Sequence, residues 1–331
     1  MQKPNLIKLQ IKFNIPDMKV NNKNCIHPWQ KKPAISKTRH LDIEPTWTLV
    51  MPVFNQEEDL HTVLDKIYKM ACYPFEIILI DDCSSDLTLK KMKEFCSNLS
   101  KYNKKIVAST IIHNKLPIFE TACDNQGFKL AKAEFIIEVQ ADIHIEEQDF
   151  DRKMIFAMKE LNLSSISGRQ VHHFSLLTKK NRWLKYPLQI IKWNFLKTEL
   201  ESFGKVGNKI FKRESTEKNV CFIGETVSRG PWLVTKKDLK KNNYLDDKNF
   251  FLGNDDHDFN RRVFKKEGRL AGFVPMDIYS IAEHGSTRKK RFGLNNKIYK
   301  YLKTNKKGSE EFKDFLLKYR PYSPIIKKII K

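Results

Sequence analysis

From about residue 46 onward, apolar residues occur in two recurring patterns, as short continuous runs and at helical spacing. Short apolar runs bounded by turn residues predict buried strands, whereas apolar residues spaced three and four apart predict helices. The apolar runs lie at Leu49–Phe54, Phe75–Ile80, Ile106–His113 and Glu134–Val139. The helical patterns lie at Leu60–Met70, Leu87–Leu99 and Ala122–Ala131. Because strands and helices alternate, we expect an α/β fold with a doubly wound, Rossmann-like, mostly parallel sheet and helices on both faces.

The second half of the chain has a less regular pattern. Met154–Leu161 predicts a helix, and Ser164–Arg169 predicts a short strand. Arg182–Phe195 carries aromatic and aliphatic residues among lysines. This spacing predicts a helix that packs into the core, or one that lies on a membrane or over an acceptor cleft. The basic, apolar end at Pro324–Lys331 predicts a frayed terminus, with membrane contact as the alternative.

Acidic residues stand where the apolar runs stop. Asp82 follows the second predicted strand, Asp142 follows the fourth, and Asp255 and Asp256 come just before a helical pattern. In open α/β sheets, ligands bind beyond the carboxyl ends of the strands, so these carboxylates can converge on one crevice. Aspartate is also common at turns and helix N-termini, and capping is the competing role for Asp255 and Asp258.

The charge balance is the unusual feature of the composition. Lysine and arginine outnumber the acidic residues by 61 to 39 in 331 residues, which gives a formal net charge of +22. The basic residues concentrate at Lys179–Lys218, Lys236–Lys241 and Arg288–Lys331. Such a surface suits nucleic acid, an anionic membrane surface or phosphorylated substrates, or it is simply a solvated basic face. We find no zinc finger, RNP motif or helix-turn-helix pattern, so no specific nucleic acid is expected.

Cysteine spacing and hydropathy indicate in which cellular compartment the protein is expected. The six cysteines are scattered without a C-x-x-C pair, which favours reduced thiols over a zinc module or disulfide scaffold. No apolar run reaches the roughly 18 residues of a membrane span. Lys3, Pro4 and Lys8 interrupt the N-terminal apolar residues too often for a secretory signal. We therefore expect a cytoplasmic protein, with peripheral binding to the cytoplasmic membrane face as an open alternative.

Five motifs occur in a fixed order. They lie at Val50–Glu57, Ile80–Asp86, Asn125–Ile136, Gln140–Asp142 and Asp255–Arg262. With these motifs the chain resembles the inverting family 2 glycosyltransferases of GT-A fold, over about residues 46 to 290. The resemblance implies a GT-A domain at 46–290. Residues 1–45, which alternate short apolar pieces with Lys, Asn and Pro, predict an N-terminal arm, and residues 291–331 form a basic C-terminal extension. Within the domain, 46–145 would be the nucleotide-binding half and 146–290 the acceptor half.

The resemblance also implies a nucleotide site. Pro52 and Phe54 would line the base pocket, Glu57 would reach the nucleoside, and Asp82 would accept a hydrogen bond from a pyrimidine ring. Gln140 would hydrogen-bond the ribose or a water. Local structure offers competing roles. Pro52 and Phe54 could be a strand-ending turn and a core aromatic. Glu57 could supply favourable charge at a helix start, and Asp82 could be a turn or cap residue.

A divalent cation, Mg²⁺ or Mn²⁺, is the cofactor that the resemblance implies. Asp142 would hold it against the two phosphates, because both ions accept carboxylate and phosphate oxygens. Gln140 stands where the family has the first acid of a D-x-D motif, which puts metal dependence in doubt. His284 occupies the position of a metal-binding histidine in many relatives, and a structural role is its alternative.

The resemblance assigns the general base to Asp256, with Asp255 as its competitor. A base in a closed cleft beside another acid is expected to have a raised pKa. Arg262 would orient the acids, or would form a surface ion pair.

The predicted activity is inverting transfer of a sugar from a nucleotide sugar, in first place a UDP-sugar. The acceptor would be a glycan or a lipid-linked molecule, as in polysaccharide biosynthesis. A sugar-1-phosphate nucleotidyltransferase is disfavoured, because Pro52–Asn55 lacks the glycine-rich loop of that class. A basic nucleic-acid-binding protein and a catalytically inactive GT-A scaffold are the remaining alternatives.

Overall fold

The computed structural model describes the following parts of the chain, which belong to one unit, Lys31–Lys331: residues 32–102, 104–172, 219–280, 299–300, 303 and 326–330, with the short stretches 200–201, 205–206 and 209–210. The predicted helix at Arg182–Phe195 and the candidate ligand His284 lie outside them. Among the helices of these parts, none combines the length and the apolar character that crossing a membrane requires.

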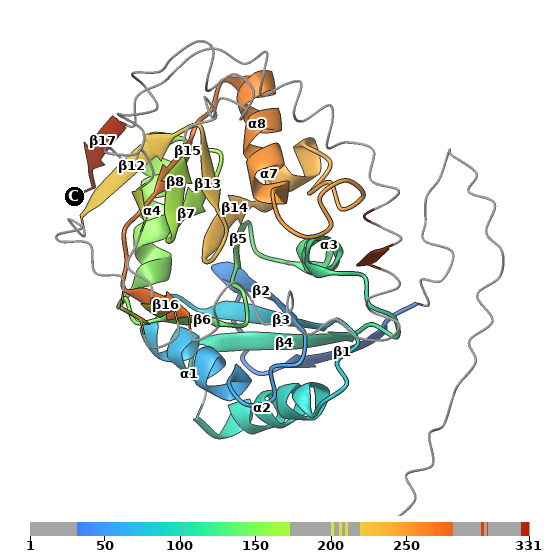
Figure 1. Ribbon diagram of the computed structural model, residues 1–331. Coiled ribbons are helices and arrows are strands. Elements are labelled where there is room, and N and C mark those ends of the chain that lie inside the picture. The colour runs from blue at the N-terminus through green and yellow to red at the C-terminus, as the bar shows by residue number, and fades with distance from the viewer. Residues whose placement is uncertain are drawn as a thin grey trace, which may run out of the picture. The chain divides into compact units, whose positions relative to one another are not determined.

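A ten-stranded sheet forms the centre of the described residues, in the order β1-β4-β3-β2-β5-β14-β7-β15-β12-β17 (Figure 1). Its strands are β1 (Ala34–Arg39), β2 (Trp47–Val53), β3 (Phe75–Asp81), β4 (Ile106–His113), β5 (Phe135–Glu138), β7 (Ile166–Ser167), β12 (Val220–Gly224), β14 (Trp232–Thr235), β15 (Ala271–Phe273) and β17 (Ile326–Ile329). The neighbours β4, β3, β2 and β5 run parallel, and beyond β5 the sheet is mixed. The α/β architecture expected from the sequence is confirmed.

Two smaller sheets complete the described strands. One has the order β11-β10-β16-β6, and the other has the order β13-β8-β9. Their members are β6 (Ile143–Ile145), β8 (Gln170–His172), β9 (Leu200–Glu201), β10 (Lys205–Val206), β11 (Lys209–Ile210), β13 (Thr226–Ser228) and β16 (Ile278–Ser280).

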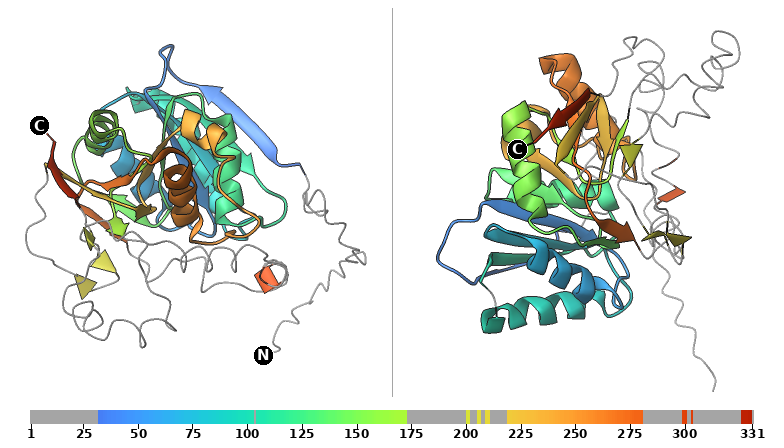
Figure 2. Two further views of the ribbon diagram at one scale, coloured as in Figure 1. Left: turned by 90° about the horizontal axis from the view of Figure 1, so that it is seen from above. Right: turned by 90° about the vertical axis from the view of Figure 1, so that its left-hand side faces the viewer.

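Helices cover both faces of the central sheet (Figures 1 and 2). They are α1 (Leu60–Met70), α2 (Thr88–Tyr102), α3 (Glu120–Leu130), α4 (Phe150–Leu161), α7 (Lys236–Lys241) and α8 (Asp255–Glu267). Along β2, Leu49 and Met51 point into the apolar layer shared with α1, α2 and α4, whereas Val50 points into the layer shared with α3, α7 and α8. This alternation follows from the period of two in a strand, and it makes the sheet doubly wound as predicted.

Edge strands extend the sheet beyond the predicted elements. β1 lies within the predicted arm and pairs antiparallel with β4, from Ala34 opposite His113 to Arg39 opposite Ala108. β17 lies in the terminus expected to fray and pairs with β12. All six residues of β1 are exposed. A strand without a buried face lacks the alternating pattern by which sequence analysis finds strands, which explains why β1 was missed.

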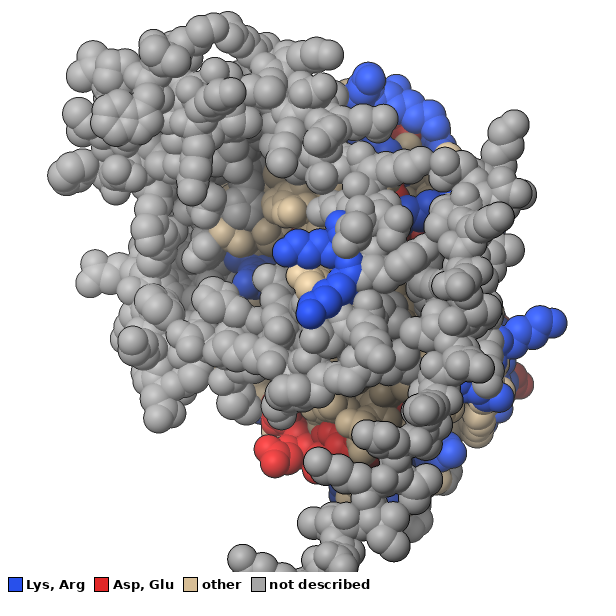
Figure 3. Space-filling view, turned by 45° about the vertical axis from the view of Figure 1, so that its right-hand side comes forward, with Lys and Arg blue, Asp and Glu red and all other residues tan. Residues whose placement is uncertain are grey.

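Charged side chains are distributed unevenly over the surface. In the view of Figure 3, the lysine and arginine side chains of the described residues form several separate groups, and a group of acidic side chains shows near the lower edge.

Gly127 allows α3 to lie close against β2. A Cβ atom at this position would lie 2.4 Å from Cγ1 of Val50 and 3.2 Å from Cδ1 of Ile80. Gly to Ala normally stabilises a helix interior by about 1 kcal/mol. Here we expect Gly127→Ala to lower the free energy of unfolding by about 1 to 3 kcal/mol, because the β-branched Val50 cannot move aside. Denaturant titration measures this change.

The control for this prediction is the double variant Gly127→Ala/Val50→Ala. Removing both γ carbons of Val50 makes room for the new methyl group, so the two substitutions should couple favourably in a double-mutant cycle. Simple additivity of the two effects would show that the close contact does not limit stability.

Candidate functional site

Asp82, at the carboxyl end of β3, anchors the segment that leads into α3. The backbone N–H groups of Ile118 and Phe119 donate to its two carboxylate oxygens, at 2.7 and 2.9 Å. Phe119 has a φ of 70°, an unusual value for a residue with a side chain. Burial raises the pKa of Asp82 to about 6, against the lowering effect of these two hydrogen bonds. Asp82 therefore fixes the start of α3, and its role toward a pyrimidine stays a prediction.

The loop after β2 carries the other residues expected near the base. Pro52 and Phe54 are half-buried. The N–H of Leu87 donates to Oε2 of Glu57 at 2.7 Å, and the N–H of Glu57 donates to Asp86 at 3.3 Å. Glu57 thus ties this loop to the loop after β3, so the two strand ends form one edge of the site.

Gln140 and Asp142 follow β5, beside the first turn of α3. Nε2 of Gln140 donates to Oε1 of Glu120 at 2.7 Å, and the hydroxyl of Ser280 donates to Oδ2 of Asp142 at 3.3 Å. Gly230 has a φ of 97°, and a Cβ atom there would lie 3.2 Å from Oε1 of Gln140. Burial, followed by the nearby Glu120 carboxylate, raises the pKa of Asp142.

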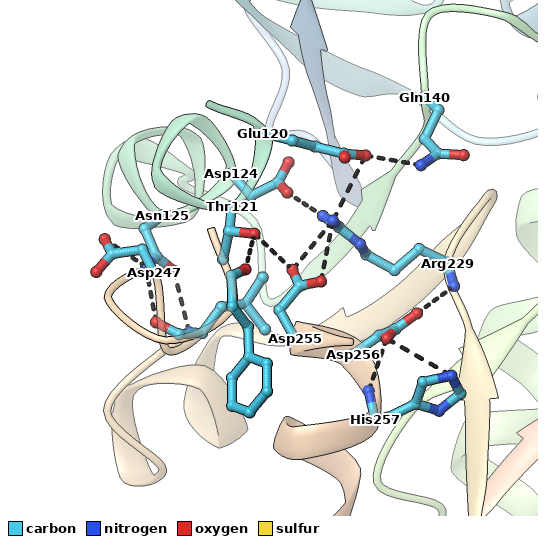
Figure 4. Close-up of polar contacts among 12 residues, drawn as sticks. Glu120, Thr121, Asp124, Asn125, Gln140, Arg229, Asp247, Asp255, Asp256 and His257 are labelled. Atoms are coloured by element: carbon cyan, nitrogen blue, oxygen red, sulfur yellow. Dashed lines mark hydrogen bonds and ion pairs between the residues drawn. The ribbon is translucent and has the colours of Figure 1, made fainter. Parts of the chain in front are cut away.

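Asp256, in the first turn of α8, accepts two backbone hydrogen bonds (Figure 4). The N–H of Arg229 donates to Oδ2 at 2.8 Å, and the N–H of His257 donates to Oδ1 at 2.7 Å. Burial favours a raised pKa for Asp256, but the His257 imidazole, the Arg229 guanidinium and the two N–H groups together lower it. The expectation of a raised pKa is wrong, because hydrogen bonds and positive charge outweigh desolvation here.

Asp255 has a different environment from its neighbour. Its side chain is fully buried and lies 3.0 Å from the Arg229 guanidinium, and the hydroxyl of Thr121 donates to it at 3.1 Å. Burial raises the pKa of Asp255 well above its usual range despite this arginine. The pKa values of the two adjacent carboxyl groups are thus shifted in opposite directions.

Arg229 joins residues that the motifs do not connect. Its guanidinium contacts Asp255 and Asp124, and it lies 3.4 Å from Oε1 of Glu120 (Figure 4). Through Glu120 the network reaches Gln140. Sequence analysis missed Arg229, Glu120 and Asp124, because no motif spacing links positions so far apart in the chain.

Arg262 contacts other residues than those of this network. Its guanidinium donates to Oδ2 of Asp258 at 2.7 Å and to the backbone carbonyls of Asn242 and Tyr244. These contacts favour the ion-pair interpretation over an orienting role for the acids.

The structure therefore gathers four of the candidate residues around the first turns of α3 and α8, namely Asp82, Gln140, Asp255 and Asp256. Asp82 holds the residue before Glu120, and Glu120 contacts Gln140 and Arg229. Among the residues that the structure describes, no group of three or more His, Cys, Asp or Glu side chains has the geometry of a metal site.

A comparison with protein families decides the classification. The family model described as glycosyl transferase family 2 matches residues 48–219. The chain belongs to this family. The family suggested by the five motifs is thereby confirmed.

Individual relatives are more distant. The undecaprenyl-phosphate 4-deoxy-4-formamido-L-arabinose transferase of Pectobacterium carotovorum is 29% identical over 114 residues, which are 33% of this chain and 33% of that protein. The chain thus spans about a third of the length of this curated relative.

Two solved structures share the fold. S. aureus TarS 1–349 in complex with UDP-GlcNAc has a TM-score of 0.50 at 16% identity, covering 82% of this chain and 70% of that one. GalNAc-T7 with UDP, GalNAc and Mn²⁺ has a TM-score of 0.50 at 14% identity, covering 73% of this chain and 46% of that one. At such identities the likeness shows the fold alone, and that fold is GT-A, as predicted.

Proposed function

We propose that this family 2 protein is an inverting glycosyltransferase that moves a sugar from a nucleotide sugar, in first place a UDP-sugar, to an acceptor hydroxyl. One observation carries the proposal. Asp256 on α8 and Gln140 after β5, which are far apart in sequence, are joined through Arg229 and Glu120 at one end of the sheet. A single-displacement transfer needs a base on one side of the reacting carbon and a diphosphate site on the other, and in this proposal Asp256 and Gln140 would lie on these two sides.

Asp256 is the proposed general base, and Asp255 is not. The Asp256 side chain is 9% exposed and the Asp255 side chain is fully buried, so only Asp256 can reach an acceptor hydroxyl. A base must also be ionised, which suits the lowered pKa of Asp256 and not the raised pKa of Asp255. Asp256 would take the acceptor's proton while the hydroxyl oxygen attacks opposite the leaving diphosphate.

The nucleotide would lie across the ends of β2 and β3. Pro52, Phe54 and Glu57 would contact its base and ribose, with Asp82 on the pyrimidine side and Gln140 beside the ribose or the phosphates. Each Asp82 oxygen accepts one backbone hydrogen bond, and a carboxylate oxygen can accept a second.

Asp142 is the proposed protein ligand of a divalent cation, Mg²⁺ or Mn²⁺. The donor set fits such an ion in part, because Asp142 offers a half-buried carboxylate but Gln140 contributes no charge. Mg²⁺ commonly binds with one or two carboxylates, substrate phosphates and water, which suits this set. The ion would neutralise charge on the leaving diphosphate, and the Mn²⁺ bound to the distant neighbour GalNAc-T7 supports it. His284, outside the described residues, is proposed as a second ligand.

A lipid-linked or glycan acceptor completes the proposal. The name of the Pectobacterium relative includes undecaprenyl-phosphate, which supports a lipid phosphate acceptor for this chain. Such an acceptor would bring the protein to the cytoplasmic face of a membrane, where a basic surface favours peripheral binding. Residues 46–145 would then form the donor half and residues 146–290 the acceptor half.

The test is a panel of nucleotide sugars, with turnover measured for the wild type and for Asp142→Ala. We expect one donor to be hydrolysed or transferred in the presence of Mn²⁺ or Mg²⁺. Asp142→Ala should lower that rate by at least roughly 10- to 100-fold, since losses of this size follow even when residues behind the metal ligands are removed. Chelation should abolish the wild-type activity.

The matched control is Asp65→Ala, since Asp65 forms an exposed pair with Lys69 on α1. This variant should match the wild type. If the panel shows neither turnover nor nucleotide binding, the proposed function fails. If Asp142→Ala is as active as the wild type, the metal assignment fails alone.

A further inference from the structure

Arg229 places a guanidinium among the acids of the site, just before Gly230 in the connection from β13 to β14. Its side chain is only 4% exposed. It contacts Asp255 at 3.0 Å, Glu120 at 3.4 Å, and Asp124. Arginine is almost never fully buried unless it is paired, and here three carboxylates pair with it.

The acids around Arg229 outnumber its single charge. Glu138, on β5, is fully buried, and neither of its carboxylate oxygens has a hydrogen-bond partner among the described residues. The Arg229 charge acts against the burial-raised pKa of Glu138, Asp124 and Asp255. Burial nevertheless raises the pKa of Asp124 to about 7. A buried ionic cluster of this kind stabilises less than an apolar core of the same volume, so a role beyond stability is a reasonable hypothesis.

The same residue holds Asp256 through its backbone. The N–H of Arg229 donates to Oδ2 of Asp256 at 2.8 Å. Because three carboxylates fix the Arg229 side chain, they also fix the backbone that positions this oxygen. Glu120, which contacts the Arg229 guanidinium, also accepts a hydrogen bond from Nε2 of Gln140 at 2.7 Å.

We propose that Arg229 is a positioning residue that sets the geometry and charge of Asp256 and couples the base to the Gln140 side of the site. The inference rests on the proposed function, in which Asp256 removes the acceptor's proton. Arg229 is too buried to contact a substrate, so it acts through Asp256 and Glu120. A displacement of the base by about 1 Å is enough to cost roughly 100-fold in rate.

The charged groups that face Asp256 come from three elements. They are Arg229 between β13 and β14, His257 and Asp255 on α8, and Asp124 on α3. Arg229 and His257 favour the ionised base, whereas the two acids oppose it. Loss of the guanidinium charge should therefore raise the pKa of Asp256 and move the acid limb of the rate–pH profile to higher pH.

Two variants test the proposal in the full chain. Arg229→Lys keeps one charge but loses the planar fork that reaches several carboxylates. Arg229→Met/Asp124→Asn removes the charge together with one buried acid, which protects the fold. For the double variant we expect kcat to fall roughly 10- to 100-fold, the donor KM to stay within about twofold, and the acid limb to rise by about one pH unit. For Arg229→Lys we expect a reduced kcat, with the acid limb of the rate–pH profile at the same pH as in the wild type.

The matched control is Arg269→Met. Arg269 also forms a fork to a carboxylate, with Asp238 at 2.5 and 3.0 Å, but it lies outside the site network. Its loss should affect thermal stability without moving the acid limb. A double variant that is folded by circular dichroism and retains the wild-type kcat and limb would overturn the proposal.

A second measurement separates this inference from the proposed function. The Asp256 carboxyl carbon can be followed by ¹³C NMR titration, with its signal assigned from Asp256→Asn. We expect its midpoint to rise by about one pH unit in the double variant. If the wild type turns over no nucleotide sugar, the proposed function fails, and the titration alone decides whether Arg229 controls Asp256. An unchanged midpoint would refute that control.

Discussion

Replacing Asp256 with asparagine is expected to lower the rate of sugar transfer by roughly 10² to 10⁴-fold, while nucleotide affinity stays nearly unchanged. The amide has the shape of the carboxylate but cannot accept the acceptor's proton. Asp256 accepts hydrogen bonds from Arg229 and His257 and lies on the acceptor side of the proposed displacement. Transfer assays and calorimetric titration with UDP measure the two quantities.

Two substitutions on the same helix sharpen this experiment. Asp258→Asn is the control, because Asp258 pairs with Arg262 and lies outside the site network. Asp255→Asn should retain more activity than Asp256→Asn, since Asp255 is fully buried. Equal loss of transfer and UDP binding in a folded Asp256→Asn variant would count against its role as base.

The elements that sequence analysis located correctly are those with a clear burial pattern. α1 has the predicted bounds, Leu60–Met70, and so does β4, Ile106–His113, because α1 buries one face at helical spacing and β4 is a nearly continuous apolar run. α3 begins at Glu120 rather than at the predicted Ala122. The cause is tertiary, because Asp82 on β3 holds the N–H groups that precede the helix.

In the site, too, sequence analysis found the residues that lie in local motifs and missed those defined by long-range contacts. Asp82, Gln140 and Asp256 were predicted as site residues because each lies in a motif at a strand end or helix start. Arg229 has no such motif, and its partners come from α3 and α8. The lowered pKa of Asp256 could not be predicted from the sequence either, because it depends in part on the guanidinium and the backbone N–H of Arg229, which lies 27 residues away.

Asp82→Asn should weaken UDP binding at least about tenfold and lower the free energy of unfolding by about 2 kcal/mol. The carboxylate accepts from the N–H groups of both Ile118 and Phe119, whereas an asparagine presents one oxygen and one NH₂ group. One buried N–H would then face a donor, and the start of α3, with Glu120, would shift. The assay belongs at pH 7.5, above the pKa of about 6, where Asp82 is ionised.

Asp151→Asn is the matched control. Asp151 is also buried and accepts backbone hydrogen bonds from Cys72 and Tyr73, together with one from the Trp47 indole at the opposite end of β2. It should lose similar stability but bind UDP normally. The ratio of UDP to ADP affinity then separates two modes of action for Asp82. A loss confined to UDP indicates contact with the pyrimidine, and an equal loss indicates action through α3. Unchanged UDP affinity in folded Asp82→Asn would remove Asp82 from the nucleotide site.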